Sequence, residues 1–133
     1  MQRNILVDLN VILDVLLERA GYKASQAILE KNSNGYTVFI SGHIVTTFAY
    51  LLEHAKVPKE EIRRNISWLL STFSVISTSD NILESALKSS ISDYEDAVIE
   101  QAALDCKASA IVTRNIKDFA QSAVPALTPE NFV

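Results

Sequence analysis

Short apolar runs rich in Val and Ile alternate with longer stretches in which apolar residues recur every three or four positions. The short runs predict strands covered on both faces, and the longer stretches predict amphipathic helices. Strands are expected at residues 4–7, 37–40, 74–77, 110–113 and 124–127. Helices are expected over residues 10–18, 22–31, 41–55, 58–73 and 79–88, with a further helix that begins at Ser92 and includes Cys106.

Strand and helix segments alternate along the whole chain. That order is typical of an α/β protein in which a parallel sheet carries helices on both faces. The 133 residues are 48% hydrophobic, include only 3 Gly and 3 Pro, and contain no linker, repeat or change of composition. We therefore expect residues 1–133 to form a single domain around a parallel sheet of four to five strands.

Cysteine content and charge narrow the class of protein. Cys106 is the single cysteine, which excludes an internal disulfide and favours a reducing compartment. No apolar run approaches the roughly 20 residues that cross a bilayer, and no signal peptide is recognisable, so we expect a cytoplasmic protein without a membrane partner. The net charge of −4 disfavours a sequence-blind polyanion binder, but it permits a nucleic-acid enzyme whose acids are neutralised by metal.

Three acidic segments stand beside expected strand ends or helix starts. The first follows strand 4–7, the second opens the helix near residue 93, and the third follows strand 110–113. The carboxyl ends of neighbouring parallel strands open into one crevice, and a helix of about 15 residues spans ~22 Å, so its start returns to the same edge. We therefore expect three carboxylates to converge there: Asp8, Asp96 and Asp118.

Clustered carboxylates repel one another, so keeping them ionised together requires a cation. Mg²⁺ or Mn²⁺ suits ligation by oxygen atoms alone, with waters completing the coordination. His43 and His54 stand alone in the sequence and do not indicate a zinc site; we interpret them as surface or structural residues. The prediction is therefore a Mg²⁺ or Mn²⁺ site.

Helix capping is the structural alternative for each acidic segment. Ser92 with Glu95 forms a capping-box pattern, Asn10 is a cap candidate for the first helix, and Thr113 or Asn115 is one for the last. Other helices in this chain begin with a plain Ser, however. The concentration of acids at three starts that share one edge favours a functional site.

Several enzyme classes are excluded or weakened by what the sequence contains. Its three glycines, Gly21, Gly35 and Gly42, cannot compose a dinucleotide-binding or P-loop motif. No Ser or Cys lies in a nucleophile-elbow context. A haloacid-dehalogenase-like phosphatase with Asp8 as nucleophile is a weaker alternative, because Asn10 stands where its second Asp is expected.

At the level of motifs, the chain resembles the PIN-domain family, small metal-dependent ribonucleases that include VapC-like toxins. The similarity is carried by the segments 7–14 (VDLNVILD), 93–97 (DYEDA) and 113–119 (TRNIKDF). The resemblance implies an α/β/α sandwich and an RNA-cleaving site. In it, Asp8, Asp96 and Asp118 would hold metal with Asp93 close by, supported by Asn10, Thr113 and Asn115, while Arg114 or Lys117 would contact the RNA backbone.

One departure from the family pattern is Thr47, which aligns where these nucleases carry a further acid. Thr47 cannot replace carboxylate charge, so a catalytically impaired module that binds RNA or protein is the alternative function. The resemblance also implies an antitoxin partner or a homodimer. We expect the contact to use apolar surface on the early helices, drawn from the large residues Tyr22, Tyr36, Phe48, Tyr50 and Trp68.

Overall fold

The computed structural model describes residues 3–132 and contains one five-stranded parallel sheet. Its strands are β1 (Arg3–Val7), β2 (Tyr36–Ser41), β3 (Ser74–Ile76), β4 (Ile111–Val112) and β5 (Ala126–Leu127), in the order β3-β2-β1-β4-β5. The predicted parallel sheet is therefore confirmed.

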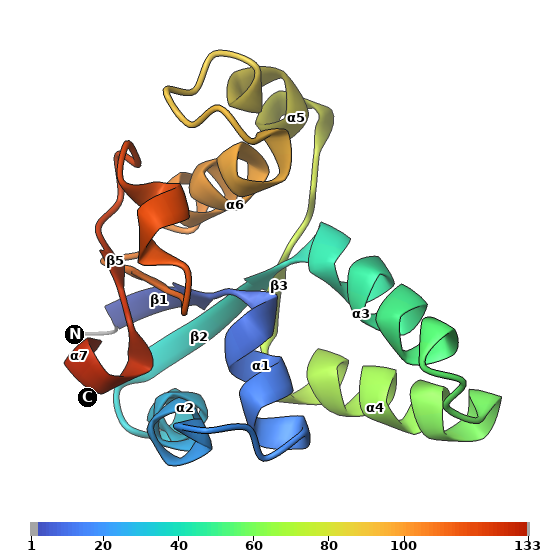
Figure 1. Cartoon of the computed structure of the whole chain (residues 1–133). Coiled ribbons are helices and arrows are strands. Elements are labelled where there is room, and N and C mark those ends of the chain that lie inside the picture. Colours follow the sequence, from blue (N-terminus) through green and yellow to red (C-terminus); the bar gives the residue numbers. More distant parts are fainter. Residues whose placement is uncertain (1–2, 133) are drawn as a thin grey trace.

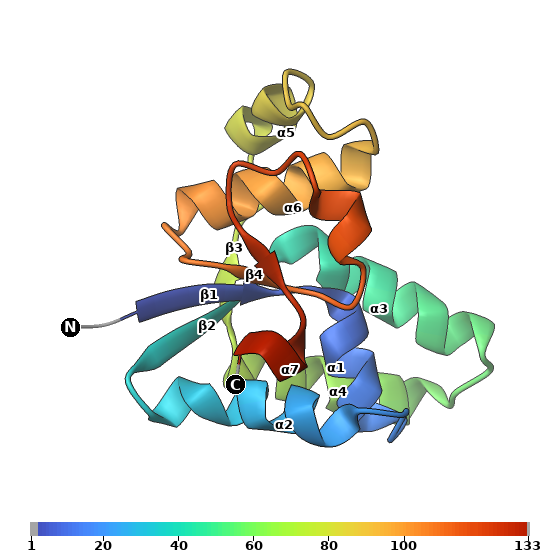
Figure 2. The same cartoon turned by 60° about the vertical axis from the view of Figure 1, so that its left-hand side comes forward.

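Helices cover both faces of this sheet, which confirms the three-layer α/β/α arrangement. They are α1 (Leu9–Leu16), α2 (Tyr22–Glu30), α3 (Gly42–His54), α4 (Lys59–Thr72), α5 (Asp80–Ala86), α6 (Tyr94–Asp105) and α7 (Pro129–Phe132), with 3₁₀ turns η1 (Lys31–Ser33) and η2 (Ile116–Phe119). In Figures 1 and 2, α5 and α6 lie on one side of the sheet and α1, α2, α4 and α7 on the other, while α3 and α4 extend together beyond its carboxyl edge.

The sheet changes direction of winding between β1 and β4. The chain adds β2 and β3 on one side of β1 and then returns to place β4 and β5 on the other. Val7 pairs with Val112, and the next residue, Asp8, donates its backbone N–H to the Val112 carbonyl at 3.0 Å. Ligand sites of open parallel sheets lie outside such a switch point, so this pairing sets where chemistry is expected.

The sheet centre is continuously apolar because both faces are covered. Ile5, Leu6 and Val7 of β1 have no exposed surface, and neither do Ile111 and Val112 of β4. Among residues 3–132, no helix has the length and apolar content to cross a membrane. Cys106 is buried at the end of α6, and burial raises the pKa of its thiol to about 11, which fits a structural thiol.

Two predicted helix starts differ from the structure. α6 begins at Tyr94, and its cap is Asp93, whose Oδ1 accepts the Asp96 N–H at 3.0 Å, so the capping role expected of Ser92 is wrong. α1 is capped by Asp8 rather than by Asn10. In both cases an aspartate takes the capping position because its carboxylate stabilises the positive end of the helix.

Candidate functional site

Asp8 lies at the junction of β1 and α1 and is held from two sides. The Leu9 N–H donates to its Oδ1 at 2.8 Å, and the Thr113 hydroxyl donates to its Oδ2 at 2.9 Å. Thr113 is buried at the end of β4 and also accepts the Asn115 N–H at 3.0 Å. Burial raises the pKa of Asp8 despite these two hydrogen bonds. The carboxylate is thus fixed in place, and no Lys or Arg of the described residues forms an ion pair with it.

A second carboxylate group faces Asp8 from the start of α6 and from η2. The pKa of Asp96 is raised to about 6, first by burial and then by the neighbouring charges of Asp93, Asp118, Asp8 and Glu95. Asp8, Asp93 and Asp118 therefore lie near enough to Asp96 to act on its charge, and their roles as metal ligands stay a prediction. The structure adds Glu95, which the sequence had assigned to a capping box. We call Asp8, Asp93, Glu95, Asp96 and Asp118 the acid cluster.

The acid cluster is suited to a divalent cation by its charge and donor atoms. Among the described residues, no Lys or Arg forms an ion pair with any of the five acids. Within residues 3–132, no three His, Cys, Asp or Glu side chains lie close enough together to share one ion as they stand. Mg²⁺, however, is commonly held by one or two carboxylates with waters completing its shell. Asp8 is the preorganised member, and the exposed side chains of Glu95 and Asp118 are free to adjust.

His43, which the sequence analysis treated as surface or structural, also faces the acid cluster. It is the second residue of α3, and its Nε2 lies 3.9 Å from Glu95 Oε2. Burial lowers the pKa of His43, and the charge of Asp8 opposes that effect. A histidine two residues after a strand end was the available sequence signal. Its place beside the acids could not be read from the sequence, because it depends on the start of α6 lying opposite the start of α3.

Thr47 lies one turn further along α3 and is half-buried. Its hydroxyl donates to the His43 carbonyl at 3.4 Å, a contact within its own helix.

Asn10 is half-buried in the first turn of α1, and its carbonyl accepts from Arg19 at 2.9 Å. Asn115 and Lys117 are exposed in or beside η2, next to Asp118. These positions keep Lys117 accessible to a ligand at the acid cluster.

Arg114 occupies a different environment from the one its predicted RNA-binding role requires. Its Nε donates to Asp14 Oδ2 at 2.7 Å, its Nη1 to Glu130 Oε2 at 2.7 Å, and its Nη2 to the Gly21 carbonyl at 2.9 Å. All three guanidinium nitrogens are therefore engaged inside the protein. This arrangement argues against the prediction that Arg114 contacts a nucleic-acid backbone and leaves Lys117 as the basic candidate.

The partners of Arg114 form a compact group that we call the Asp14 network: Asp14, Arg19, Ser25, Arg114 and Glu130. Asp14 is only 4% exposed and also accepts from Arg19 Nε at 3.0 Å and from the Ser25 hydroxyl at 2.8 Å. Gly21 has a φ of +84°, and a Cβ there would lie 2.8 Å from Arg114 Nη2. Glycine is thus required at this turn for both its backbone conformation and the close approach of the guanidinium.

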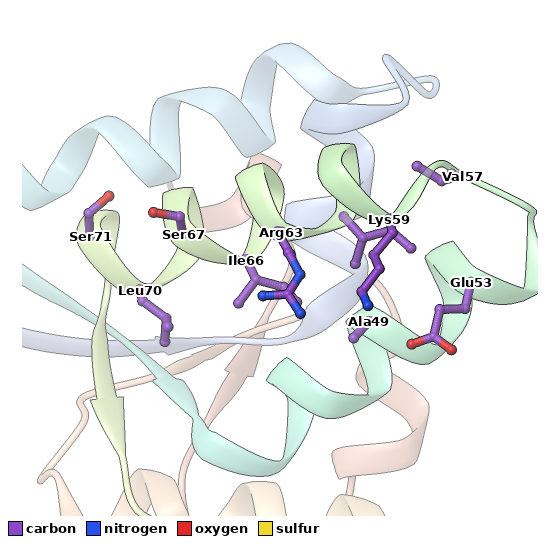
Figure 3. A pocket seen from close by; sticks show the side chains of 10 residues that line it. Ala49, Glu53, Val57, Lys59, Arg63, Ile66, Ser67, Leu70 and Ser71 are labelled. Carbon is purple, nitrogen blue, oxygen red and sulfur yellow. The ribbon is translucent and has the colours of Figure 1, made fainter.

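A groove lies between α3 and α4, away from the acid cluster. Its volume is about 1060 Å³, and Figure 3 shows Lys59 and Arg63 of α4 reaching toward α3. Ile62, Ile66 and Leu70 supply the apolar part of its lining. Of the large residues expected to form an interface on the early helices, Phe48 is entirely buried in the core, whereas Tyr50 of α3 is 62% exposed. Exposed apolar surface is therefore found on α3 and α4, where Leu51 and Leu70 are also exposed.

Comparison with known proteins gives a consistent result. The family model of the PIN domain matches residues 4–117. VapBC2 from Rickettsia felis, bound to a DNA fragment from its promoter, is similar with a TM-score of 0.72 and 21% identity, covering 94% of this chain and 98% of that one. A toxin–antitoxin complex from Klebsiella pneumoniae has a TM-score of 0.66 and 27% identity, covering 94% and 97%.

VapC20 of Mycobacterium tuberculosis, a toxin that cleaves the sarcin–ricin loop, has a TM-score of 0.64 and 13% identity, covering 80% of this chain and 86% of that one. No curated protein matches the chain significantly. The family match runs from β1 into η2 and includes Asp8, Asp93, Glu95 and Asp96; it ends one residue before Asp118. The resemblance inferred from the three motifs is therefore confirmed, and the chain belongs to the PIN-domain family.

Proposed function

We propose that this protein is a metal-dependent endoribonuclease that hydrolyses RNA phosphodiester bonds, with Mg²⁺ or Mn²⁺ at the acid cluster. The observation that carries the proposal is that Asp8 and Asp118 lie near enough to Asp96, beside the β1–β4 switch point, to act on its charge. Burial first, and then the charges of the neighbouring acids, raise the pKa of Asp96 to about 6. Buried charges are normally paired with an opposite charge, and no Lys or Arg of the described residues pairs with these carboxylates. Membership of the PIN-domain family supports a nuclease, and a cytoplasmic location accompanies this proposal.

The residues of the site have separable tasks. Asp8 is oriented by Leu9 and Thr113, so its carboxylate is the fixed ligand, while Asp96 and Asp118 bring further negative charge from α6 and η2. When bound, the ion supplies activation of a water and neutralisation of charge on the phosphate. Lys117, exposed beside Asp118, is placed to contact the RNA backbone. No side chain becomes covalently attached, in contrast to the phosphatase alternative.

Metal-dependent cleavage by substituted proteins tests this function. Asp8→Asn and Asp96→Asn should each lose more than about 99% of RNA cleavage in Mg²⁺ or Mn²⁺, since single catalytic groups commonly contribute 10²-fold or more. Asp105→Asn is the matched control, because Asp105 is an exposed acid at the far end of the same helix. Cleavage that persists in excess chelator, or that is equal in the Asp8 and Asp105 variants, would contradict the proposal.

A catalytically impaired RNA- or protein-binding module is the second candidate, and Thr47 is the observation that favours it. Thr47 brings no charge to the site, and its hydroxyl bonds within its own helix. In that case the wild-type protein would cleave no RNA with either metal, and binding of its partner would be unchanged by Asp8→Asn. A covalent aspartyl-phosphate on Asp8 would instead support the phosphatase alternative.

We also propose an antitoxin-like protein partner, seated in the groove between α3 and α4. The groove combines Ile66 and Leu70 with two cations, Lys59 and Arg63, and one acid, Glu53. Its net positive charge suits an amphipathic segment with acidic residues. The similar structure from Klebsiella pneumoniae is a toxin–antitoxin complex, which supports this kind of partner. If a neighbouring gene encodes an antitoxin, Leu70→Glu should abolish its binding, while Leu87→Glu, at an exposed site beyond α5, should not. If the groove instead joins two copies, Leu70→Glu would convert a dimer to a monomer in light scattering.

A further inference from the structure

His43 is held with one ring nitrogen anchored and the other directed at the acid cluster. Its side chain is only 20% exposed, and its Nε2 is a buried atom without a hydrogen-bond partner in the described part of the chain. Leaving a buried polar atom without a partner is unfavourable, so such atoms in native proteins generally indicate a function or a bound ligand. Nε2 of His43 is therefore a candidate for contact with a ligand.

The opposite side of the ring is fixed by residues that follow two neighbouring strands. His43 Nδ1 lies 2.7 Å from the hydroxyl oxygen of Ser41, a residue with no exposed surface at the end of β2. The His43 backbone N–H donates to Thr78 Oγ1 at 3.0 Å, and Thr78 Oγ1 lies 3.4 Å from Ser41 Oγ. When Nδ1–H donates to Ser41, Nε2 carries the lone pair. This is the arrangement found in metal-binding histidines, whose second nitrogen donates to a protein group.

The Nε2 lone pair points toward carboxylates. Glu95 Oε2 is 3.9 Å away, which is too long for a hydrogen bond, and Asp8 is close enough to affect the pKa of His43. Two donor atoms that each lie 2.0–2.2 Å from one ion are separated by about 3–4.4 Å, depending on their angle at the ion. The Nε2–Oε2 distance falls inside that range. Glu95 has a side chain that is 61% exposed, so it can rotate to complete the coordination.

We propose that Nε2 of His43 is a nitrogen ligand of the divalent cation, in addition to the carboxylates of the acid cluster. The inference rests on the proposed metal-dependent function and specifies the chemistry of its site. His43 lies one helical turn before Thr47, so it supplies a donor atom in the region where Thr47 contributes no carboxylate. A nitrogen ligand favours first-row transition-metal ions over Mg²⁺, which prefers oxygen. The site should therefore bind Mn²⁺ more tightly than Mg²⁺.

Pulsed EPR on the Mn²⁺-loaded, tag-free full chain tests the assignment directly. The wild-type protein should show a hyperfine coupling from one directly bound nitrogen. Labelling with ¹⁵N-histidine should change that coupling if the nitrogen belongs to a histidine, and the chain contains only 2 histidines to which it could be assigned. His43→Gln should remove the coupling, and the matched control His54→Gln should keep it, since His54 is exposed at the other end of α3. The measurement on wild-type protein is decisive even if His43→Gln folds poorly.

Metal affinity provides a second readout. Loss of the group that hydrogen-bonds to a metal ligand typically lowers metal affinity roughly 10–100-fold, and Ser41→Ala should lower Mn²⁺ affinity within that range. His43→Gln removes the ligand itself and should lower Mn²⁺ affinity by at least as much. Mg²⁺ affinity should change less in both variants. Stoichiometric Mn²⁺ binding without a nitrogen coupling would overturn the role of His43 while leaving the proposed nuclease intact. Absence of any Mn²⁺ or Mg²⁺ binding would overturn both proposals.

Discussion

The acid cluster and the Asp14 network are two groups of carboxylates built partly from the same segment, residues 113–119, yet their charges are balanced in opposite ways. In the Asp14 network, Asp14 receives hydrogen bonds from Arg114, Arg19 and Ser25, and Arg114 in turn pairs with Glu130. In the acid cluster, Asp96 is surrounded by other acids, and its pKa is raised to about 6. The carboxylates of the Asp14 network are therefore balanced by cations within the fold, whereas those of the acid cluster, in our proposal, require a bound cation.

The segment serves both groups because successive side chains at a strand end point to opposite sides. Thr113 directs its hydroxyl to Asp8 of the acid cluster, and the next residue, Arg114, is directed to Asp14 and α2. Ion pairing with Arg114 lowers the pKa of Glu130, whereas burial raises that of Asp8. The charge of Glu130 is thus balanced by Arg114 within the fold, whereas Asp8 accepts hydrogen bonds but has no Lys or Arg partner among the described residues, so its charge is available to a ligand.

Removal of Arg114 should produce the largest change in stability. Arg114→Ala leaves Asp14 buried with only Arg19 and Ser25, and we expect the free energy of unfolding to fall by roughly 3 kcal/mol, as for other broken buried pairs. Urea denaturation measures this loss. Arg64→Ala, at an exposed arginine of α4, is the control and should change stability by less than about 0.5 kcal/mol. An equal, small effect of both substitutions would show that the Asp14 network does not stabilise the fold.

Asp96→Asn should have the opposite sign in metal-free protein. Because the folded-state pKa of Asp96 is about 6 against an ordinary value of 3.8, the folded state holds the proton more tightly, and stability falls as the pH rises from about 4 to 6. The substitution should therefore stabilise the metal-free protein by about 1 kcal/mol above pH 6, allowing for solvent screening, and by little below pH 4. Thermal unfolding in chelator across this pH range is the measurement. Destabilisation at pH 7 would mean that Asp96 already has a favourable partner.

Thr47→Glu tests whether the acid cluster lacks a charge that the family pattern supplies. A carboxylate at this position of α3 should raise Mg²⁺ affinity roughly tenfold, about 1.4 kcal/mol, because it adds an oxygen ligand of the kind Mg²⁺ prefers. Calorimetric titration compares it with Thr46→Glu, at the exposed neighbouring position. Unchanged affinity in Thr47→Glu would show that this position does not face the ion.

Lys117→Ala should have the smallest effect. Lys117 is exposed beside Asp118, so its removal should leave stability unchanged and weaken binding to single-stranded RNA a few-fold. The negative slope of log association constant against log salt concentration should become shallower by about 0.7, the value for one lost phosphate contact on a single strand. Fluorescence anisotropy in a salt series, with cleavage blocked by Asp8→Asn, measures both. An unchanged slope would remove Lys117 from the RNA-binding surface.

The order of strands and helices and the identity of the convergent acids were readable in the sequence, because both depend on local periodicity and on one rule of parallel sheets. Apolar runs such as residues 4–7 indicate covered strands, and acids that follow such strands meet at the carboxyl edge. Asp8 and Asp118 follow such strands, and the length of the helix that begins near residue 93 returns Asp96 to the same edge. The motifs around these three acids also indicated the family to which the chain belongs. Capping was less predictable, since Asp93 competes with the adjacent Ser92 for the same position.

Only the tertiary structure decided which charges are balanced. Arg114 is four residues from Asp118 in the sequence, yet its guanidinium binds Asp14, 100 positions away, because the pairing of β4 with β1 directs it to that side. Likewise, nothing near His43 in the sequence indicates that Glu95 will lie opposite its Nε2; that contact exists because α3 and α6 begin at the same edge of the sheet. Sequence patterns report the burial of each residue, whereas the partner of a charged side chain is set by strands and helices that meet only in the folded protein.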